Sequence, residues 1–346
     1  MNRGGKNGLL AFASCCASFA RGQGSVVGWG GTSFGESSPP PGAFLKITAA
    51  NYHAVGIRPD GTLEAWGIPY WGALNVPPGT FSEVAAGGTG DSDFSLAIRS
   101  DGTLVGWGYN NWGQATPPAG TFVAVSAGGS WGIGLRSDNT IAQWGLGATT
   151  YPPPPGQFVS ISAGRSHNLA LRGDGTVAAW WGDNVSGVLN VPPGLYSCIA
   201  AGNGFSLAIR VDGTLAAWGS NTYGVLTVPG GTFATVVAGG NFGLARRADG
   251  SLAAWGSNSA GQLNVPSGAY SAIAAGGAFG LAMRACYPNC DGSTSPPVLN
   301  VLDFACFLNQ FAAGDSRANC DGSTTAPALN VLDFACFINS FAAGCS

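Results

Sequence analysis

The sequence predicts a mainly β protein: a seven-bladed β-propeller closed by its N-terminal strand and followed by a small helical module. Three observations favour this architecture. A tryptophan-glycine pair recurs at a nearly fixed spacing, short runs of β-forming residues alternate with turn residues, and the composition changes abruptly at Cys286. The expected boundaries are 1–20 for a signal peptide, 21–285 for the propeller and 286–346 for the C-terminal module.

The tryptophan-glycine pairs follow one another at 37 residues, except for one step of 41 residues. A fixed period of this length marks repeated units that bury their apolar faces by stacking on one another. The four extra residues of the long step lie near Thr89 to Asp93 and are assigned to a loop, in which Asp91 and Asp93 are expected to be solvated, with binding of a cation or partner as the alternative. The tryptophans assigned to the repeat are Trp29, Trp66, Trp107, Trp144, Trp181, Trp218 and Trp255.

Each unit reads as a set of short strands. Runs of small and β-branched residues are bounded by Gly, Pro, Asn and Asp, a pattern typical of strands and their turns. Asp-Gly pairs such as Asp101-Gly102 predict two-residue hairpins, whose positive φ suits glycine. With a further short strand near Leu74 to Pro77, a unit is expected to hold about four strands, the size of a propeller blade.

The two ends of the repeat region complement each other. The last unit stops at Arg284 without its own Trp-Gly strand, and the first unit begins with only that strand, from Ser25 to Gly30. Six complete units and two halves therefore give seven blades, with the N-terminal strand completing the last one. Closure of this kind leaves no open sheet edge.

Residues Ala163 to Gly182 carry most of the pattern Ala-Gly-x-x-His-x-Leu-Ala-Leu-x-x-Asp-Gly followed by Trp-Gly. In this the chain resembles the regulator-of-chromosome-condensation repeat. Its compact 37-residue period is most similar to secreted bacterial propellers such as the propeller-type β-lactamase inhibitor protein. The resemblance implies the fold but not one function, since such propellers serve as exchange factors, inhibitors and binding platforms.

The N-terminus predicts export. Arg3 and Lys6 form a basic start, Leu9 to Ala20 is a short apolar segment, and Ser18-Phe-Ala20 provides a small-x-small cleavage site. A secreted or cell-surface protein, extracellular or periplasmic, is expected, with a lipoprotein cysteine at Cys15 as the alternative. No segment is long and apolar enough to predict a membrane span. Charged residues make up 9% of the chain and the net charge is −3, which argues against nucleic-acid binding.

The tail contains two near-identical units with a period of 30 residues. Each has oxygen-bearing side chains at alternate positions, a glycine, and a carboxylate at the start of an expected helix, which is typical of an EF-hand-type calcium loop. The first helix is expected to carry Phe304, Phe307, Leu308 and Phe311 as one apolar stripe ending at Gly314. The second unit repeats this stripe.

The two units resemble dockerin, the duplicated calcium module that binds cohesin domains. The resemblance implies two calcium ions and a cohesin-like or cell-surface protein partner. Each loop is about three residues longer than the usual 12, and asparagine replaces the usual first aspartate, so cysteine-stapled turns without metal are the alternative. The implied ligands are Asn289, Asp291, Ser293, Asn300 and Asp303 in the first loop, and Asn319, Asp321, Ser323, Asn330 and Asp333 in the second.

Six cysteines fall in the tail, which is too small to be stable on its core alone, so disulfide bonds are expected. Six cysteines allow 15 pairings. Symmetry between the two units is the argument for the favoured pairing, which is Cys290 with Cys306, Cys320 with Cys336, and Cys286 with Cys345.

The propeller predicts a binding surface rather than an active site. No nucleophile elbow, phosphate loop or carboxylate pair is evident, and His53 and His167 both occupy the histidine position of the repeat. Aromatic residues recur in the loop after the repeat tryptophan, where they could bind a protein or polysaccharide; packing between blades is the alternative. A polysaccharide-degrading enzyme and a secreted enzyme inhibitor are the other candidate functions. The possible ligand face comprises Phe34, Trp71, Trp112, Tyr151 and Tyr223.

Overall fold

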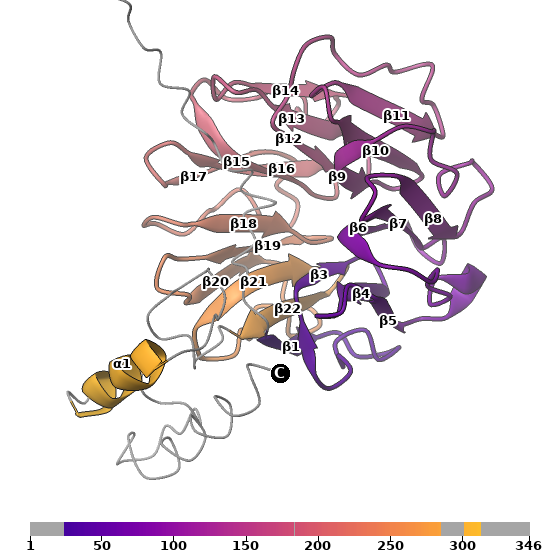
Figure 1. The fold of residues 1–346 in the computed structure, drawn as a ribbon. Coiled ribbons are helices and arrows are strands. Elements are labelled where there is room, and N and C mark those ends of the chain that lie inside the picture. Colours follow the sequence, from indigo (N-terminus) through magenta and orange to yellow (C-terminus); the bar gives the residue numbers. More distant parts are fainter. Residues whose placement is uncertain (1–23, 183, 285–300, 313–346) are drawn as a thin grey trace, which may run out of the picture.

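The computed structural model describes residues 24–182, 184–284 and 301–312. Within these residues the strands form seven antiparallel sheets, six of three strands and one of four. Each sheet is one blade: its first strand lines a central channel and its third lies at the periphery of the ring (Figure 1). The first six blades are β3 (Lys46–Ala49), β4 (His53–Ile57), β5 (Leu63–Gly67); β6 (Phe81–Gly87), β7 (Phe94–Arg99), β8 (Leu104–Gly108); β9 (Phe122–Ala127), β10 (Trp131–Arg136), β11 (Ile141–Gly145); β12 (Ser160–Ala163), β13 (Asn168–Leu171), β14 (Val177–Trp180); β15 (Tyr196–Ala201), β16 (Phe205–Arg210), β17 (Leu215–Gly219); and β18 (Thr235–Ala238), β19 (Phe242–Arg246), β20 (Leu252–Gly256).

The seventh blade joins the two ends of the propeller. Strands β21 (Tyr270–Ala275) and β22 (Phe279–Arg284) are completed by β1 (Gly24–Gly30), which also pairs with the short β2 (Ala43–Phe44). Strand β1 runs antiparallel to β22, with Val26 opposite Met283 and Gly30 opposite Phe279. The prediction that the N-terminal strand completes the last blade is therefore confirmed.

The blades have fewer strands than the sequence predicted. The segment from Leu74 to Pro77, expected as a short fourth strand, forms a turn and irregular coil, and a short 3₁₀ turn (Tyr70–Gly72) precedes it. Proline has no N–H to donate to a sheet ladder, which explains why this proline-ended segment adds no strand. The four-strand expectation was wrong for the six three-stranded blades.

The core lies between neighbouring blades rather than within any one of them. In the contact between the fourth and fifth blades, Leu169 and Leu171 of β13 pack against Tyr196, Ile199 and Trp218. Each such side chain contributes roughly 1.5–3 kcal/mol when fully buried. Six repeat tryptophans also donate Nε1–H, at 2.8–3.0 Å, to a backbone carbonyl of the preceding blade's loop. These contacts tie each blade to the one before it.

In the fourth blade the repeat tryptophan is Trp180, not Trp181 as the spacing suggested. Trp180 lies opposite Asn168 at the end of β14, is 8% exposed, and donates Nε1–H to Gln143 Oε1 at 2.9 Å. Trp180 is a buried member of the cluster between the third and fourth blades, whereas Trp181, just beyond the end of β14, is only partly buried against that cluster. Trp181 takes the position that glycine holds in the other blades and has a φ of 74°.

Helix α1 (Val301–Ala312) covers the first helix predicted in the tail. Phe307 is fully buried and its ring lies 5.8 Å from that of Phe311, whereas Leu308 is 38% exposed. The expected apolar stripe is thus interrupted at Leu308. The second predicted helix and both complete calcium loops lie outside the described residues.

Candidate functional site

Side-chain hydrogen bonds brace several of the loops that follow the third strands. The Asn110 Oδ1 atom accepts a hydrogen bond from the Ala115 N–H at 2.9 Å, and Asn221 does the same for Leu226 at 3.0 Å. The glycine that follows the aromatic residue has a φ near 75°, as at Gly113 (75°) and Gly224 (73°). Because the loop backbone is fixed at both points, the residue between them is displayed in a defined position.

Each predicted ligand-face residue is exposed in the structure. The exposed fraction is 45% for Phe34, 61% for Trp71, 54% for Trp112, 46% for Tyr151 and 51% for Tyr223. Exposed tryptophan and tyrosine side chains are frequent anchors of binding surfaces, because they offer a large apolar area at low entropic cost. We call these five residues the aromatic loop face.

Further aromatic side chains extend this face, and the sequence reasoning missed them. The ring of Tyr52, in the loop after β3, lies 5.3 Å from that of Phe34, and Tyr109 lies 5.3 Å from Trp71. The first contact joins a loop after a first strand to a loop after a third strand. Since antiparallel strands reverse direction at every turn, both loop types lie on one face of the ring and the hairpins on the other.

The fourth blade carries a distinct aromatic cluster. Trp181 stacks on Trp131 with ring centroids 4.3 Å apart and an interplanar angle of 21°, and Tyr151 lies 5.2 Å from Trp181. Positive φ is unfavourable for a bulky residue, so this backbone is strained, and the ring stacking offsets that strain. The doubled tryptophan was the sequence signal that could have revealed the cluster.

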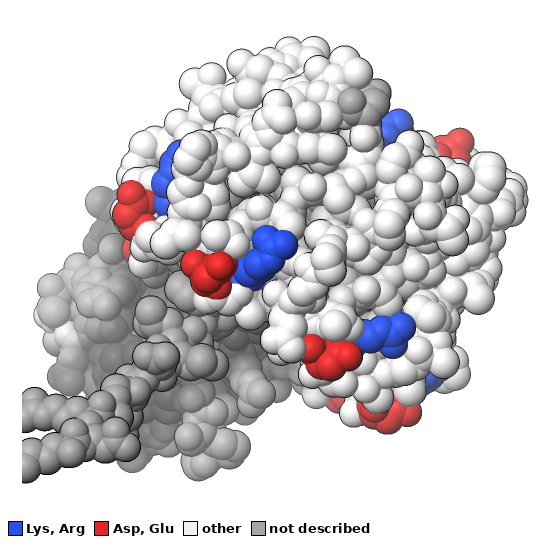
Figure 2. Space-filling model, turned by 90° about the horizontal axis from the view of Figure 1, so that it is seen from above, with Lys and Arg blue, Asp and Glu red and all other residues white. Residues whose placement is uncertain are grey.

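Charged side chains gather on the opposite, hairpin face, where they stabilise the turns. The Asp101 carboxylate accepts hydrogen bonds from the N–H and hydroxyl of Thr103 at 2.9 and 2.7 Å, and these bonds lower the pKa of Asp101. The Arg99 guanidinium lies 5.3 Å from the Phe81 ring centre. Figure 2 shows a largely uncharged side of the molecule, on which basic and acidic side chains lie beside one another. The charges of the hairpins therefore have structural roles in the turns.

A cleft opens on the loop face between the fourth, fifth and sixth blades. Its volume is about 430 Å³, within the roughly 300–1,000 Å³ typical of small-molecule sites. Phe205 and Val225, both buried, supply its apolar part. The polar lining consists of Arg165, Asn203, Ser220, Thr222, Tyr223 and Asn241.

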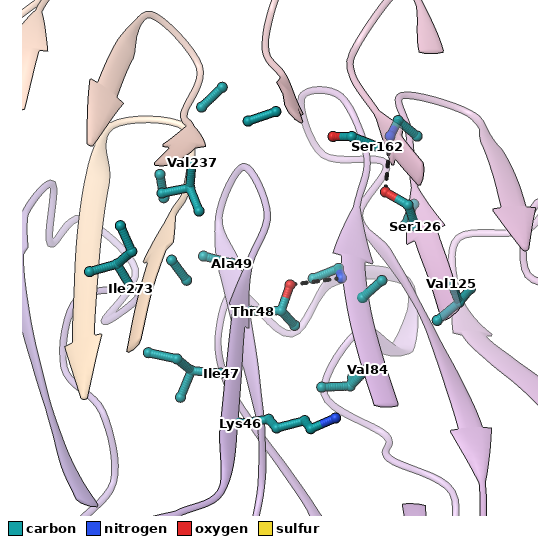
Figure 3. Close-up of a pocket in the computed structure, with 18 of the residues that line it drawn as sticks. Lys46, Ile47, Thr48, Ala49, Val84, Val125, Ser126, Ser162, Val237 and Ile273 are labelled. Atoms are coloured by element: carbon teal, nitrogen blue, oxygen red, sulfur yellow. Dashed lines mark hydrogen bonds between the residues drawn. The ribbon is translucent and has the colours of Figure 1, made fainter. Parts of the chain in front are cut away.

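The central channel has a volume of about 250 Å³ and is lined by the first strands of all seven blades. Most lining side chains are small. Thr48 and Ser126 accept hydrogen bonds from backbone N–H groups of the next blade, at 3.2 and 3.0 Å (Figure 3). Lys46 pairs with Glu83, whose pKa is raised by burial despite the attraction of that ammonium. The channel side chains thus mainly link neighbouring blades.

A buried Ser-His-Asp arrangement occurs between the first two blades. His53 Nδ1 lies 2.9 Å from Asp93 Oδ2, and His53 Nε2 lies 2.7 Å from Ser95 Oγ. All three residues have an exposed fraction of zero, so no substrate reaches the serine. The expectation of a solvated loop was wrong for Asp93, because its carboxylate also accepts the Tyr52 N–H at 3.0 Å and is enclosed. Asp91 is exposed.

The second repeat histidine lacks a carboxylate partner. His167 Nε2 lies 2.8 Å from Ser206 Oγ, whereas its Nδ1 has no hydrogen-bond partner within the described part of the chain. Burial lowers the pKa of His167 to about 4. Because a His-Ser pair recurs without the aspartate, these contacts act as structural links between blades.

The predicted calcium ligands and disulfide cysteines lie outside the described residues, apart from Asp303 and Cys306, which fall within α1. Across the described ranges no group of three His, Cys, Asp or Glu residues is placed to hold a metal ion. None of the helical segments described has the length and apolarity that a bilayer crossing requires.

Comparison with known proteins supports the repeat assignment. The "Regulator of chromosome condensation (RCC1) repeat" matches residues 196–225 and 233–262, in the fifth and sixth blades. The fold is a propeller of the RCC1 type. No curated protein matches the sequence.

Solved structures show the same fold at low sequence identity. Prp20p from Saccharomyces cerevisiae, described with its binding to Gsp1p and histones, is 14% identical with a TM-score of 0.66, covering 85% of this chain and 97% of that one. Human WBSCR16 is 15% identical with a TM-score of 0.61, covering 75% of this chain and 99% of that one. The CRINKLY ectodomain of the Arabidopsis thaliana receptor kinase ACR4 is 22% identical with a TM-score of 0.55, covering 74% and 91%. At these identities the likeness concerns the fold alone.

Proposed function

We propose that this protein is a non-catalytic binding protein whose aromatic loop face binds a polysaccharide. The exposure of all five aromatic residues on the loops of one face is the observation that carries this proposal, and side-chain hydrogen bonds brace the loops of Trp112 and Tyr223. Sugar rings present flat C–H faces that stack on aromatic side chains, while their hydroxyls need neutral donors and acceptors. The loop face offers both, and the charged side chains of the hairpins lie on the other face.

A protein ligand is the second candidate, and the fold favours it. Prp20p, which shares the fold, is described with protein partners, and a rigid ring with many loops suits protein recognition as well. Catalysis is not proposed, because the Ser95-His53-Asp93 arrangement is sealed from solvent.

Native gel electrophoresis through soluble polysaccharides tests the proposal. The full chain is compared with a variant carrying Trp71→Ala and Trp112→Ala, and with a control carrying Leu195→Ala on the hairpin face. We expect at least one neutral or acidic polysaccharide to retard the wild type and the control but not the aromatic variant. If the polysaccharide retards the aromatic variant as much as the wild type, the assignment of this face is overturned. A parallel assay for released reducing ends is expected to show no hydrolysis.

For the tail, we propose that residues 286–346 form a calcium-dependent docking module of an exported protein, which joins a cohesin-like or cell-surface partner. Support comes from the duplicated sequence and from a helix beginning at Val301, close to the helix predicted after the first loop. Calorimetric titration of the full chain with CaCl₂ is expected to show two binding events. The double variant Asp303→Asn and Asp333→Asn should lose both calcium-binding events. A heat of binding equal to that of the wild type would contradict the ligand set.

A further inference from the structure

We infer that the cleft between the fourth, fifth and sixth blades binds an acidic sugar residue, a uronate, through its carboxylate and its pyranose ring. This inference rests on the proposed function, since it names the sugar class recognised at one part of the aromatic loop face. It is carried by the lining of the cleft, in which one exposed aromatic side chain, several neutral polar groups and one cation converge.

The aromatic and neutral groups fit a pyranose. Tyr223, 51% exposed, offers a ring face at the cleft on which sugar C–H groups can stack. Asn203 and Asn241 each provide an acceptor and two donors, which matches hydroxyl groups that act in both roles. Ser220 Oγ and Thr222 Oγ1 lie 2.9 Å apart, so these two hydroxyls hold one another in position at the cleft.

The positive charge of Arg165 at the cleft favours an acidic sugar over a neutral one. Arg165 is exposed, and no side chain among the described lining residues is acidic. The described ion pairs of the protein do not involve its guanidinium. A guanidinium in such surroundings binds a carboxylate through two parallel hydrogen bonds.

Arg165 is not required by the repeat. It stands two residues after the end of β12, and the corresponding residues after β9, β15, β18 and β21 are Gly129, Asn203, Gly240 and Gly277. The other described arginines mostly occupy the hairpin face, where Arg99, for example, donates to the Pro78 carbonyl at 3.1 Å. A cation therefore lies on the loop face at this cleft for a reason other than folding.

Calorimetry with matched sugars tests this inference. The full-length protein is titrated, without divalent cations, with trisaccharides of galacturonate and glucuronate and with their neutral methyl esters. We expect the wild type to bind at least one acid about tenfold or more tightly than its ester, because hydrogen bonds to charged groups change affinity by roughly ten- to hundredfold. Failure of both acids to bind more tightly than their esters would overturn the inference.

Two variants and one control locate the site. Arg165→Gln should remove the preference for the acid while leaving the affinity for the ester unchanged. Tyr223→Ala should weaken the affinity for the acid and the affinity for the ester by about tenfold or more. Leu195→Ala, on the hairpin face, should bind as the wild type does. A persistent acid preference in Arg165→Gln contradicts the role of the guanidinium, provided that its thermal unfolding matches the wild type.

The outcome also separates this inference from the proposed function. If a neutral polysaccharide retards the wild type in the gel assay and the variant with Trp71→Ala and Trp112→Ala loses that retardation, the aromatic loop face binds glycans. A lack of uronate preference in calorimetry would then overturn the inference alone.

Discussion

The buried His167 makes the stability of the propeller depend on pH in a way that can be calculated. Burial lowers its pKa to about 4, whereas a histidine in the unfolded chain has a pKa of about 6.5. A depressed pKa means that the folded state favours the neutral ring. The stabilisation is therefore complete above pH 6.5 and is lost as the pH falls toward 4, because the unfolded chain then binds more protons.

The size of this effect follows from the two pKa values. At 1.36 kcal/mol for each pKa unit, lowering the pH from 7 to 4.5 costs the folded state about 2 kcal/mol through His167 alone. Carboxylates in general titrate over the same interval, so the contribution of His167 must be isolated by difference. The variant His167→Asn keeps a polar side chain for Ser206, 2.8 Å from the ring in the wild type, but cannot take up a proton.

Urea unfolding at pH 7 and pH 4.5, followed by tryptophan fluorescence, measures this difference. We expect His167→Asn to be less stable than the wild type at pH 7, and to lose about 2 kcal/mol less than the wild type on acidification. Equal losses in the two proteins would refute the reasoning, since they would show that His167 takes up a proton as readily in the folded state as in the unfolded chain.

Three further predictions concern the architecture. Trp107→Phe should lower the free energy of unfolding by about 1–3 kcal/mol, because the buried Ala73 carbonyl loses its Nε1–H donor; urea unfolding measures this. Asp93→Ala should cost about 2–3 kcal/mol, since His53 and the Tyr52 N–H lose their acceptor, and a stability equal to wild type would contradict the network. Deleting residues 1–30 removes β1, so β22 gains an open edge; light scattering should detect self-association, and a monodisperse monomer with unchanged thermal stability would argue against closure by β1.

The repeat period allowed the ring and its closure to be predicted, because the missing strand at Arg284 and the lone strand at Ser25 were visible in the sequence. The choice between Trp180 and Trp181 could not be made from spacing, since it depends on which of the two residues pairs with Asn168 at the end of β14. The segment from Leu74 to Pro77 was predicted as a strand because of its apolar residues, although its proline has no N–H to donate to a sheet ladder.

The candidate site was predicted only in part. Regular placement of aromatic residues in one loop of each unit identified Phe34 and Trp71, but the contact of Tyr52 with Phe34 depends on how adjacent blades meet. The cleft joins Arg165 to Tyr223, which are far apart in the sequence and belong to different blades. Burial of Asp93 was missed because its partner His53 lies 40 residues away, across a blade boundary.

Hydroxyl-radical footprinting of the full chain, free and bound to a polysaccharide that retards it, tests the central claim most directly. The rate of oxidation is compared between the loop face, at Trp71, Trp112 and Tyr223, and the hairpin face, at Leu195 and Val211, which are 48% and 58% exposed. We predict protection on the loop face and unchanged oxidation at Leu195 and Val211. Protection of Leu195 and Val211 with unprotected loop aromatics would contradict the proposal that the aromatic loop face binds the ligand.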